Sequence, residues 1–200
     1  MFKLNEGQKY IINEAVKWFY NSYEQVFQYD GPPGSGKSVV LMEIIKRLGL
    51  DIMTEVAPMS FIGSASLVMR MKGLFSSRTI HSWLYQVKEI NALDENGNII
   101  MDTLLNRPIK VPKFIPVTSL DSRIKLIVID EGFTVPLSMR PQLERFGIKI
   151  LVCGDQYQLP PVGDLPAFLV SGKIYHLTEV MRQTGRDDIV YLTNRVRTGL

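Results

Sequence analysis

The stretch "YDGPPGSGKSVV", residues 29–40, decides the fold class of this chain. It fits the pattern G-x-x-x-x-G-K-[ST], a spacing that bends the backbone around a polyphosphate. Glycine lets backbone amides approach the phosphates, the lysine brings a positive charge to the terminal phosphates, and the serine offers a hydroxyl to Mg²⁺. We therefore expect Mg²⁺-dependent ATP binding, with Ser38 as a metal ligand and Lys37 as a catalytic residue as well. The residues expected to bind ATP are Gly31, Pro32, Pro33, Gly34, Ser35, Gly36, Lys37 and Ser38.

The segments on either side of this loop support the same interpretation. "EQVFQY" before it predicts a strand, and "SVVLMEIIKRLG" after it predicts a helix that ends at Gly49. The positive end of such a helix dipole attracts phosphate. An ordinary glycine-rich turn is the alternative, and it would not require a strand before the loop and a helix after it.

Composition bounds the class of protein without identifying it. The chain has 200 residues, 46% of them hydrophobic, and a net charge of +3, which suits one sizeable domain or a domain with an insertion. No apolar run approaches the roughly 20 residues that span a bilayer. "MFKLNEGQKY" lacks a secretory apolar segment, so we expect no membrane association and a cytoplasmic location, or the host-cell cytoplasm if the chain is viral. The single cysteine, Cys153, lies in the apolar run "IKILVCG" and is interpreted as a core residue rather than a reactive thiol.

Apolar runs alternate with amphipathic stretches, a pattern typical of a parallel sheet covered by helices. We predict an α/β three-layer sandwich of the P-loop NTPase type. Residues 88–120 break the alternation with an Asn-Gly turn and several prolines, and they predict a small inserted subdomain containing β-structure, which leaves 1–87 and 121–200 as the ATPase domain. The expected strands are 25–29, 52–57, 124–129, 148–153 and 174–178, and the expected helices are 6–22, 37–48, 60–72, 79–87, 136–145 and 186–198.

Gln8 near the N-terminus has two interpretations. In "LNEGQ", Asn5 can cap a helix and Gln8 can reach back to its backbone amide. A glutamine upstream of a phosphate loop can instead recognise an adenine edge, and the residues alone leave both open.

Two acidic residues follow a second buried strand. "KLIVIDEG" places Asp130 and Glu131 after an apolar run, at the sheet edge where ligands of α/β proteins bind. Asp130 can hold Mg²⁺ through water, and Glu131 can orient and deprotonate the attacking water. This pair favours hydrolysis over transfer of the phosphoryl group to a substrate, the alternative being two solvated carboxylates that only cap the strand.

The next apolar run ends in "GDQYQLPPVGD", residues 154–164, which resembles motif III of superfamily 1 DNA helicases of the RecD and Dda type. The resemblance implies a RecA-like domain in which Gln158 senses the terminal phosphate. A polar loop closed by prolines is the simpler interpretation of the same residues. "YHLTEVMRQ" resembles motif IV of this family, which implies that Arg182 reaches the terminal phosphate, whereas an ion pair with Glu179 is the simpler alternative.

Further segments resemble the family's DNA-contacting motifs. "EVAPMSFIGSASLVMRMKG" is similar to motif Ia with methionine in place of the usual threonine, and "SSRTIHSWLYQ" matches a Thr-Ile-His-Ser segment. The resemblance implies contacts to single-stranded DNA from Pro58, Ser60, Thr79 and His81, while His81 could equally be a packed residue. The expected DNA surface also includes three scattered basic residues, Arg70, Lys72 and Arg78. It includes two aromatic residues, Trp83 and Phe114, which could stack on bases or could instead belong to the core.

The resemblance covers residues 3–200 and implies an ATP-dependent helicase that moves from 5′ to 3′ on single-stranded DNA. Such motors close a cleft between two RecA-like domains around ATP, so we expect a second RecA-like domain in a longer protein and only a partial motor here. Two alternatives remain: a stand-alone PhoH-like P-loop ATPase, and a nucleotide-gated binding module without hydrolysis. The Leu-Pro-Pro after Gln158 argues against the first, and intact Lys37, Asp130 and Glu131 argue against the second.

Overall fold

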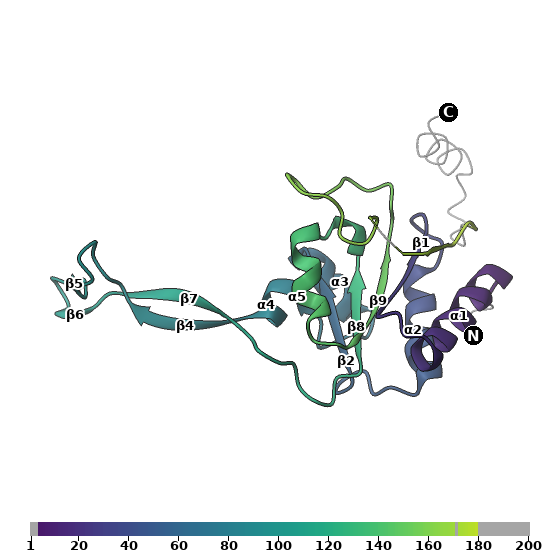
Figure 1. The fold of residues 1–200 in the computed structure, drawn as a ribbon, viewed down its shortest axis with the longest axis horizontal. Coiled ribbons are helices and arrows are strands. Elements are labelled where there is room, and N and C mark those ends of the chain that lie inside the picture. The colour runs from purple at the N-terminus through teal and green to yellow at the C-terminus, as the bar shows by residue number, and fades with distance from the viewer. Residues whose placement is uncertain (1–3, 171, 180–200) are drawn as a thin grey trace.

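A six-stranded parallel sheet forms the centre of the molecule (Figure 1). The structure is a computed structural model and describes residues 4–170 and 172–179. Across the sheet the strand order is β10-β1-β9-β8-β2-β3, and every neighbouring pair is parallel. The strands are β1 (Val26–Asp30), β2 (Val56–Ser60), β3 (Arg78–Thr79), β8 (Leu126–Asp130), β9 (Lys149–Gly154) and β10 (Ile174–His176).

Both faces of this sheet are covered, because its central strands send apolar side chains alternately to each side. On β8, Leu126 and Val128 join one core with the first two helices, while Ile127 and Ile129 join a second core on the opposite face. The predicted three-layer α/β sandwich is therefore confirmed. The helices are α1 (Glu6–Asn21), α2 (Lys37–Leu48), α3 (Gly63–Met71), α4 (Ile80–Leu84) and α5 (Arg140–Glu144), with 3-10 turns at Gly132–Thr134 and Leu137–Met139.

The strand expected at 52–57 begins later than predicted, at Val56. Asp51 closes a turn before it, accepting the Met53 amide on its side chain at 2.8 Å and the Glu55 amide on its carbonyl at 2.8 Å. The helix expected at 60–72 starts only at Gly63, because the preceding residues complete β2 and the bend after it.

Two other predicted helices are shorter than their patterns suggested. The helix expected at 79–87 ends at Leu84, and from Tyr85 the backbone pairs with a distant strand instead. The helix expected at 136–145 is a 3-10 turn first and becomes α-helical only from Arg140. The strands expected at 25–29, 124–129, 148–153 and 174–178 correspond to β1, β8, β9 and β10, and the helix expected at 186–198 lies outside the described residues.

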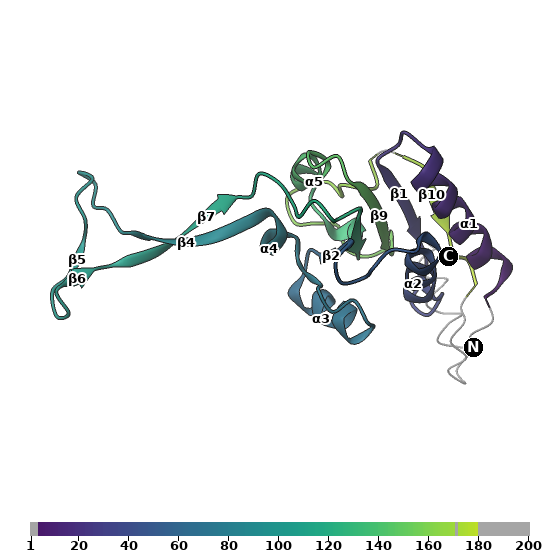
Figure 2. The same cartoon turned by 90° about the horizontal axis from the view of Figure 1, so that it is seen from below.

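A long antiparallel ribbon projects from the sandwich (Figures 1 and 2). It consists of β4 (Tyr85–Asn91) paired with β7 (Lys110–Pro116), and the short pair β5 (Met101–Asp102) and β6 (Arg107–Pro108) lies at its far end. We call residues 85–116 the arm. The β-containing insertion predicted from sequence is present, with its paired strands beginning at Tyr85. Among residues 4–170 and 172–179, no helix combines the length and apolar character needed to cross a lipid bilayer.

Candidate functional site

The phosphate loop joins the end of β1 to the first turn of α2. Gly34 and Gly36 adopt left-handed backbone conformations, with φ of 86° and 87°, which glycine accepts without steric cost. The Gly31 amide donates to the carbonyl of Gly154 at 3.2 Å, so the loop is attached to the end of the neighbouring strand β9. Helix α2 begins at Lys37 directly after the loop, and no side chain caps its N-terminus. The positive end of its helix dipole therefore lies beside the loop, where it favours phosphate.

Lys37 and Ser38 are both engaged within the protein. The Lys37 ammonium group donates to the carbonyl oxygens of Gly31 at 2.8 Å and Pro32 at 3.4 Å. The Ser38 hydroxyl accepts a hydrogen bond of 2.8 Å from Lys72, which follows α3. Lys72 was expected on the DNA surface, and the structure places its ammonium group at the nucleotide site instead. Each ammonium group carries three N–H donors, so these bonds leave both lysines at least one donor for a phosphate oxygen.

Asp130 and Glu131 lie at the carboxyl end of the sheet, as the sequence predicted, and Gln158 meets them there. The Gln158 side-chain amide donates to the Glu131 carboxylate at 2.9 Å, and the Glu131 backbone amide donates to the Asp130 carboxylate at 3.0 Å. Glu131 has a φ of 52°, a conformation that non-glycine residues adopt at a cost and that often marks functional sites. Partial burial and the neighbouring Asp130 charge raise the pKa of the Glu131 carboxyl, while the Lys37 charge opposes this shift.

Two buried side chains lie beneath these carboxylates. The Cys153 thiol donates to Asp130 Oδ1 at 3.3 Å, and the Tyr29 hydroxyl donates to the carbonyl of Lys37 at 2.9 Å. Burial raises the pKa of both the Cys153 thiol and the Tyr29 hydroxyl well above their ordinary values, and the Asp130 charge adds to each shift. The interpretation of Cys153 as a core residue is confirmed, since the residue is 1% exposed.

Gln8 forms the capping box predicted from sequence. Its backbone amide donates to the Asn5 side chain at 2.7 Å, and its side-chain oxygen accepts the Asn5 backbone amide at 3.1 Å. Its side-chain amide also donates to the carbonyl of Ser35 at 3.0 Å, inside the phosphate loop. The structure therefore places Gln8 beside the nucleotide site, and recognition of an adenine edge stays a prediction.

The oxygen donors at this edge fit Mg²⁺. In the part of the chain that the structure describes, no three His, Cys, Asp or Glu side chains gather into a metal cluster. Mg²⁺ at a nucleotide site does not need one, because it takes one or two protein oxygens and fills its shell with phosphate oxygens and water. The Ser38 hydroxyl and the Asp130 carboxylate would be those protein oxygens, as expected from the sequence.

Comparison with known proteins identifies the family. The sequence profile of an AAA domain, AAA_30, matches residues 3–200. The chain belongs to this family. These are the ATPase domains of RecD- and Pif1-type superfamily 1 helicases.

Solved structures agree with the fold of this AAA domain. The crystal structure of Pif1 helicase from Candida albicans is 22% identical, with a TM-score of 0.63 over 98% of this chain and 44% of its own. The crystal structure of Bacteroides Pif1 bound to single-stranded DNA is 18% identical, with a TM-score of 0.63, and the match covers 98% of this chain and 46% of the Bacteroides chain. These likenesses show the RecA-like fold. The uncharacterized protein R530 of Acanthamoeba polyphaga mimivirus is 27% identical over 209 residues, covering 92% of this chain and 40% of that protein. The chain thus spans less than half the length of these relatives.

The residues expected at the DNA surface of the AAA domain divide into two groups. Pro58 and Ser60 are buried in β2, and the Ser60 hydroxyl lies 2.8 Å from the Ile62 carbonyl and 2.6 Å from the Ser66 hydroxyl. Both side chains are therefore buried in the chain without DNA, and their contact with a DNA strand stays a prediction. Thr79 caps α4 and is half-buried, whereas His81 is exposed. Arg182 lies outside the described residues.

The His81 ring lies within an aromatic group on the surface of the AAA domain. Its centroid is 6.0 Å from that of Phe61 and 6.3 Å from that of Tyr85. The guanidinium of Arg78 covers the ring of the nearby Trp83 at 4.1 Å. Flat rings and a cationic group are the features on which bases and phosphates of single strands bind.

Near the nucleotide site, the contacts of Asp30, His176 and Cys153 were not predicted from the sequence, and neither was the position of Lys72. Asp30, at the end of β1, is 3% exposed and lies 2.6 Å from Nδ1 of His176 on β10. Asp30 precedes the phosphate loop directly, a signal that could have been used, but the pairing of β10 with β1 could not be read from the chain. The hydrogen bond from Cys153 to Asp130 was missed for the same reason.

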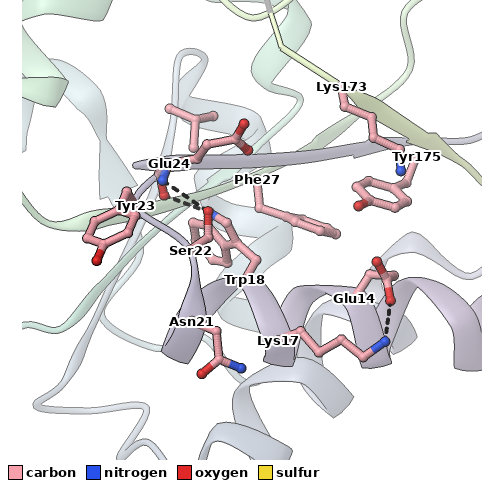
Figure 3. A pocket seen from close by; sticks show the side chains of 11 residues that line it. Glu14, Lys17, Trp18, Asn21, Ser22, Tyr23, Glu24, Phe27, Lys173 and Tyr175 are labelled. Carbon is pink, nitrogen blue, oxygen red and sulfur yellow. Dashed lines mark hydrogen bonds and ion pairs between the residues drawn. The ribbon is translucent and has the colours of Figure 1, made fainter.

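A separate hollow of about 550 Å³ lies at the beginning of β1 (Figure 3). Trp18, Phe27 and Tyr175 line it with aromatic rings, and Lys17 pairs with Glu14 at 2.8 Å on its rim. Because the phosphate loop follows the end of β1, the hollow and the nucleotide site lie at opposite ends of that strand.

Proposed function

We propose that this chain is the ATP-hydrolysing domain of a DNA helicase that moves 5′ to 3′ along single-stranded DNA. The hydrogen bond of 2.9 Å between Gln158 and Glu131 carries the proposal. This bond joins the carboxylate suited to activating water with the turn that follows β9. A movement of that turn would therefore move the Glu131 carboxylate as well. An ATPase that performs work needs such a connection between its catalytic base and a loop that can respond to the phosphate.

The residues at the sheet edge have separate roles in this proposal. Lys37 leaves the carbonyls of Gly31 and Pro32 and neutralises the terminal phosphates. Glu131 accepts a proton from the attacking water, whose oxygen bonds to the γ-phosphorus as ADP departs. Mg²⁺, when bound, neutralises charge on the phosphate oxygens, and Ser38 and Asp130 would hold it.

The DNA part of the proposal rests on two surfaces. Thr79 and the exposed His81 lie beside the aromatic group already described, which suits stacking of unpaired bases. On the arm, Lys88 and Lys113 stand directly opposite each other on neighbouring strands. Like charges in that position are destabilising without an anion between them, and a DNA phosphate would supply one. Bacteroides Pif1, whose fold this chain shares, was solved with single-stranded DNA.

Strand separation is proposed to need a second RecA-like domain in the full-length protein. On the turn that carries Gln158, Leu159 is 88% exposed and Val162 is 103% exposed, which is an apolar surface suited to closure by another domain. Arg182 is proposed to reach the terminal phosphate when that cleft closes. A cytoplasmic location, or the host-cell cytoplasm for a viral chain, is proposed with it.

ATP turnover with and without single-stranded DNA tests the proposal. We expect Mg²⁺-dependent hydrolysis that DNA stimulates, and we expect Glu131→Gln to abolish hydrolysis while it keeps ATP binding. Glu24→Gln is the matched control, because Glu24 is exposed at the beginning of β1. Equal turnover by the Glu131→Gln variant and the parent would refute the assignment of the base. ATP hydrolysis that ignores DNA would refute the motor while leaving the ATPase intact.

A further inference from the structure

A buried polar row runs beneath the nucleotide site. Tyr29 of β1 and Cys153 of β9 are register partners across the parallel pair, and Asp130 ends the next strand, β8. Tyr29 is 0% exposed and Cys153 is 1% exposed, and both belong to the core that α1 and α2 cover. A thiol and a phenol in such a place must satisfy their donors internally, because water does not reach them.

Each of these donors is used on a residue of the nucleotide site. The Cys153 thiol donates to Asp130 Oδ1 at 3.3 Å, a distance suited to a sulfur donor, and the Glu131 backbone amide donates to the same oxygen at 3.0 Å. The Tyr29 hydroxyl donates to the carbonyl of Lys37, the first residue of α2, at 2.9 Å. The row therefore contacts the proposed metal carboxylate at one end and the start of the phosphate-binding helix at the other.

The two bonds to Oδ1 leave the carboxylate asymmetric. Within the described residues, Asp130 Oδ2 accepts no hydrogen bond, whereas Oδ1 is held from below by a thiol and from the side by a backbone amide. A carboxylate held in this way cannot rotate about its Cβ–Cγ bond without breaking both bonds. The oxygen that remains available is the one that a cation can bind.

We propose that Cys153 is a positioning residue that orients the Asp130 carboxylate for Mg²⁺, acting from beneath the sheet edge without touching the nucleotide. This inference rests on the proposed function, since it concerns the metal that accompanies ATP. If Cys153 served packing alone, any small side chain would suffice at position 153. If it orients Asp130, the side chain at this position must donate a hydrogen bond, so variants with and without a donor distinguish the two roles.

The first test is the S–H stretching band of the protein without nucleotide. The chain has one cysteine, so this infrared band reports on Cys153 alone. We expect a band at the lower frequency of a hydrogen-bonded thiol, which moves to higher frequency in Asp130→Ala. Asp121→Ala is the matched control, because Asp121 is exposed and paired with Arg123, and it should leave the band in place. A band that is the same in the parent and in Asp130→Ala would overturn the inference.

The second test is the Mg²⁺ concentration that half-saturates ATP binding. We expect Cys153→Ala to raise it roughly three- to tenfold, the value of one ordinary intramolecular hydrogen bond, because a thiol is a weak donor. Cys153→Ser keeps a donor in a similar volume and should restore a value within about twofold of the parent. Equal Mg²⁺ requirements in the Ala and Ser variants would overturn the positioning role and leave the ATPase proposal standing. If the parent chain binds no ATP, the ATPase proposal and the positioning role of Cys153 are both overturned, even where the S–H band shifts in Asp130→Ala.

Discussion

The contact between Gln8 and the phosphate loop predicts an unusually large cost for Gly36→Ala. Gly36 has a φ of 87°, and a Cβ added there would press against the side-chain amide of Gln8. A left-handed alanine costs roughly 1–2 kcal/mol by itself. Gln8 would also have to move, which breaks its bond of 3.0 Å to Ser35 and its bond of 3.1 Å to Asn5. At about 1 kcal/mol for each bond, Gly36→Ala should lower the free energy of unfolding by about 3–4 kcal/mol in total.

Gly49→Ala is the matched control for the strain alone. Gly49 ends the same helix α2 with a φ of 66°, and nothing lies within 4 Å of the position of its added Cβ. Its cost in urea unfolding should therefore be only about 1–2 kcal/mol. In a Gln8→Ala background the clash is gone, so Gly36→Ala should then cost about as much as Gly49→Ala. Equal costs for the two glycine variants in the parent chain would refute the contact between Gln8 and the loop.

Three further predictions follow from the charges of the site and the arm. The pKa of Glu131 is raised, and a base must be ionised to accept a proton. As the pH is lowered, ATP turnover should therefore begin to fall at a higher pH than it would with an ordinary glutamate. A pH–rate profile whose acidic limb lies at the pKa of an ordinary glutamate would contradict this. The pKa values of Tyr29 and Cys153 are raised in the folded chain, so their contribution to stability is complete below the unfolded thiol pKa of about 8.5 and is lost as pH rises above it. Urea unfolding at neutral and alkaline pH should show a smaller alkaline loss for Cys153→Ala than for the parent. Lys88→Glu should stabilise the arm by roughly 0.2–1 kcal/mol through a cross-strand pair with Lys113 and weaken binding to single-stranded DNA, and unchanged DNA anisotropy would exclude a role for the arm in that binding.

Local sequence patterns were sufficient for much of the nucleotide site. The loop from Gly31 to Ser38 could be predicted because its glycines and lysine act through backbone conformation and spacing, which neighbouring residues determine. Asp130 and Glu131 could be predicted to lie at the same edge, because parallel strands end on one side of a sheet. The end of α2 at Gly49 was correct for a similar reason, since a left-handed glycine terminates the helix locally.

Predictions failed where a distant segment decided the local structure. Tyr85 continues an amphipathic helical pattern, yet it pairs with Pro116, because β7 offers backbone partners that no helix could use at that point. The burial of Ser60 was not predicted either, and it arises because β2 lies between β8 and β3. Neither outcome is encoded within a window of neighbouring residues.

By itself, the sequence predicted a polyphosphate-binding loop between a strand and a helix, with two carboxylates on a strand nearby. The tertiary structure alone decided which side chains support that site: Lys72 on Ser38, Gln158 on Glu131, and Cys153 beneath Asp130. The physical reason is the range of the interactions. Backbone conformation depends on neighbours along the chain, whereas a hydrogen bond between strands depends on their order and register, which only the packed core of the whole sheet establishes.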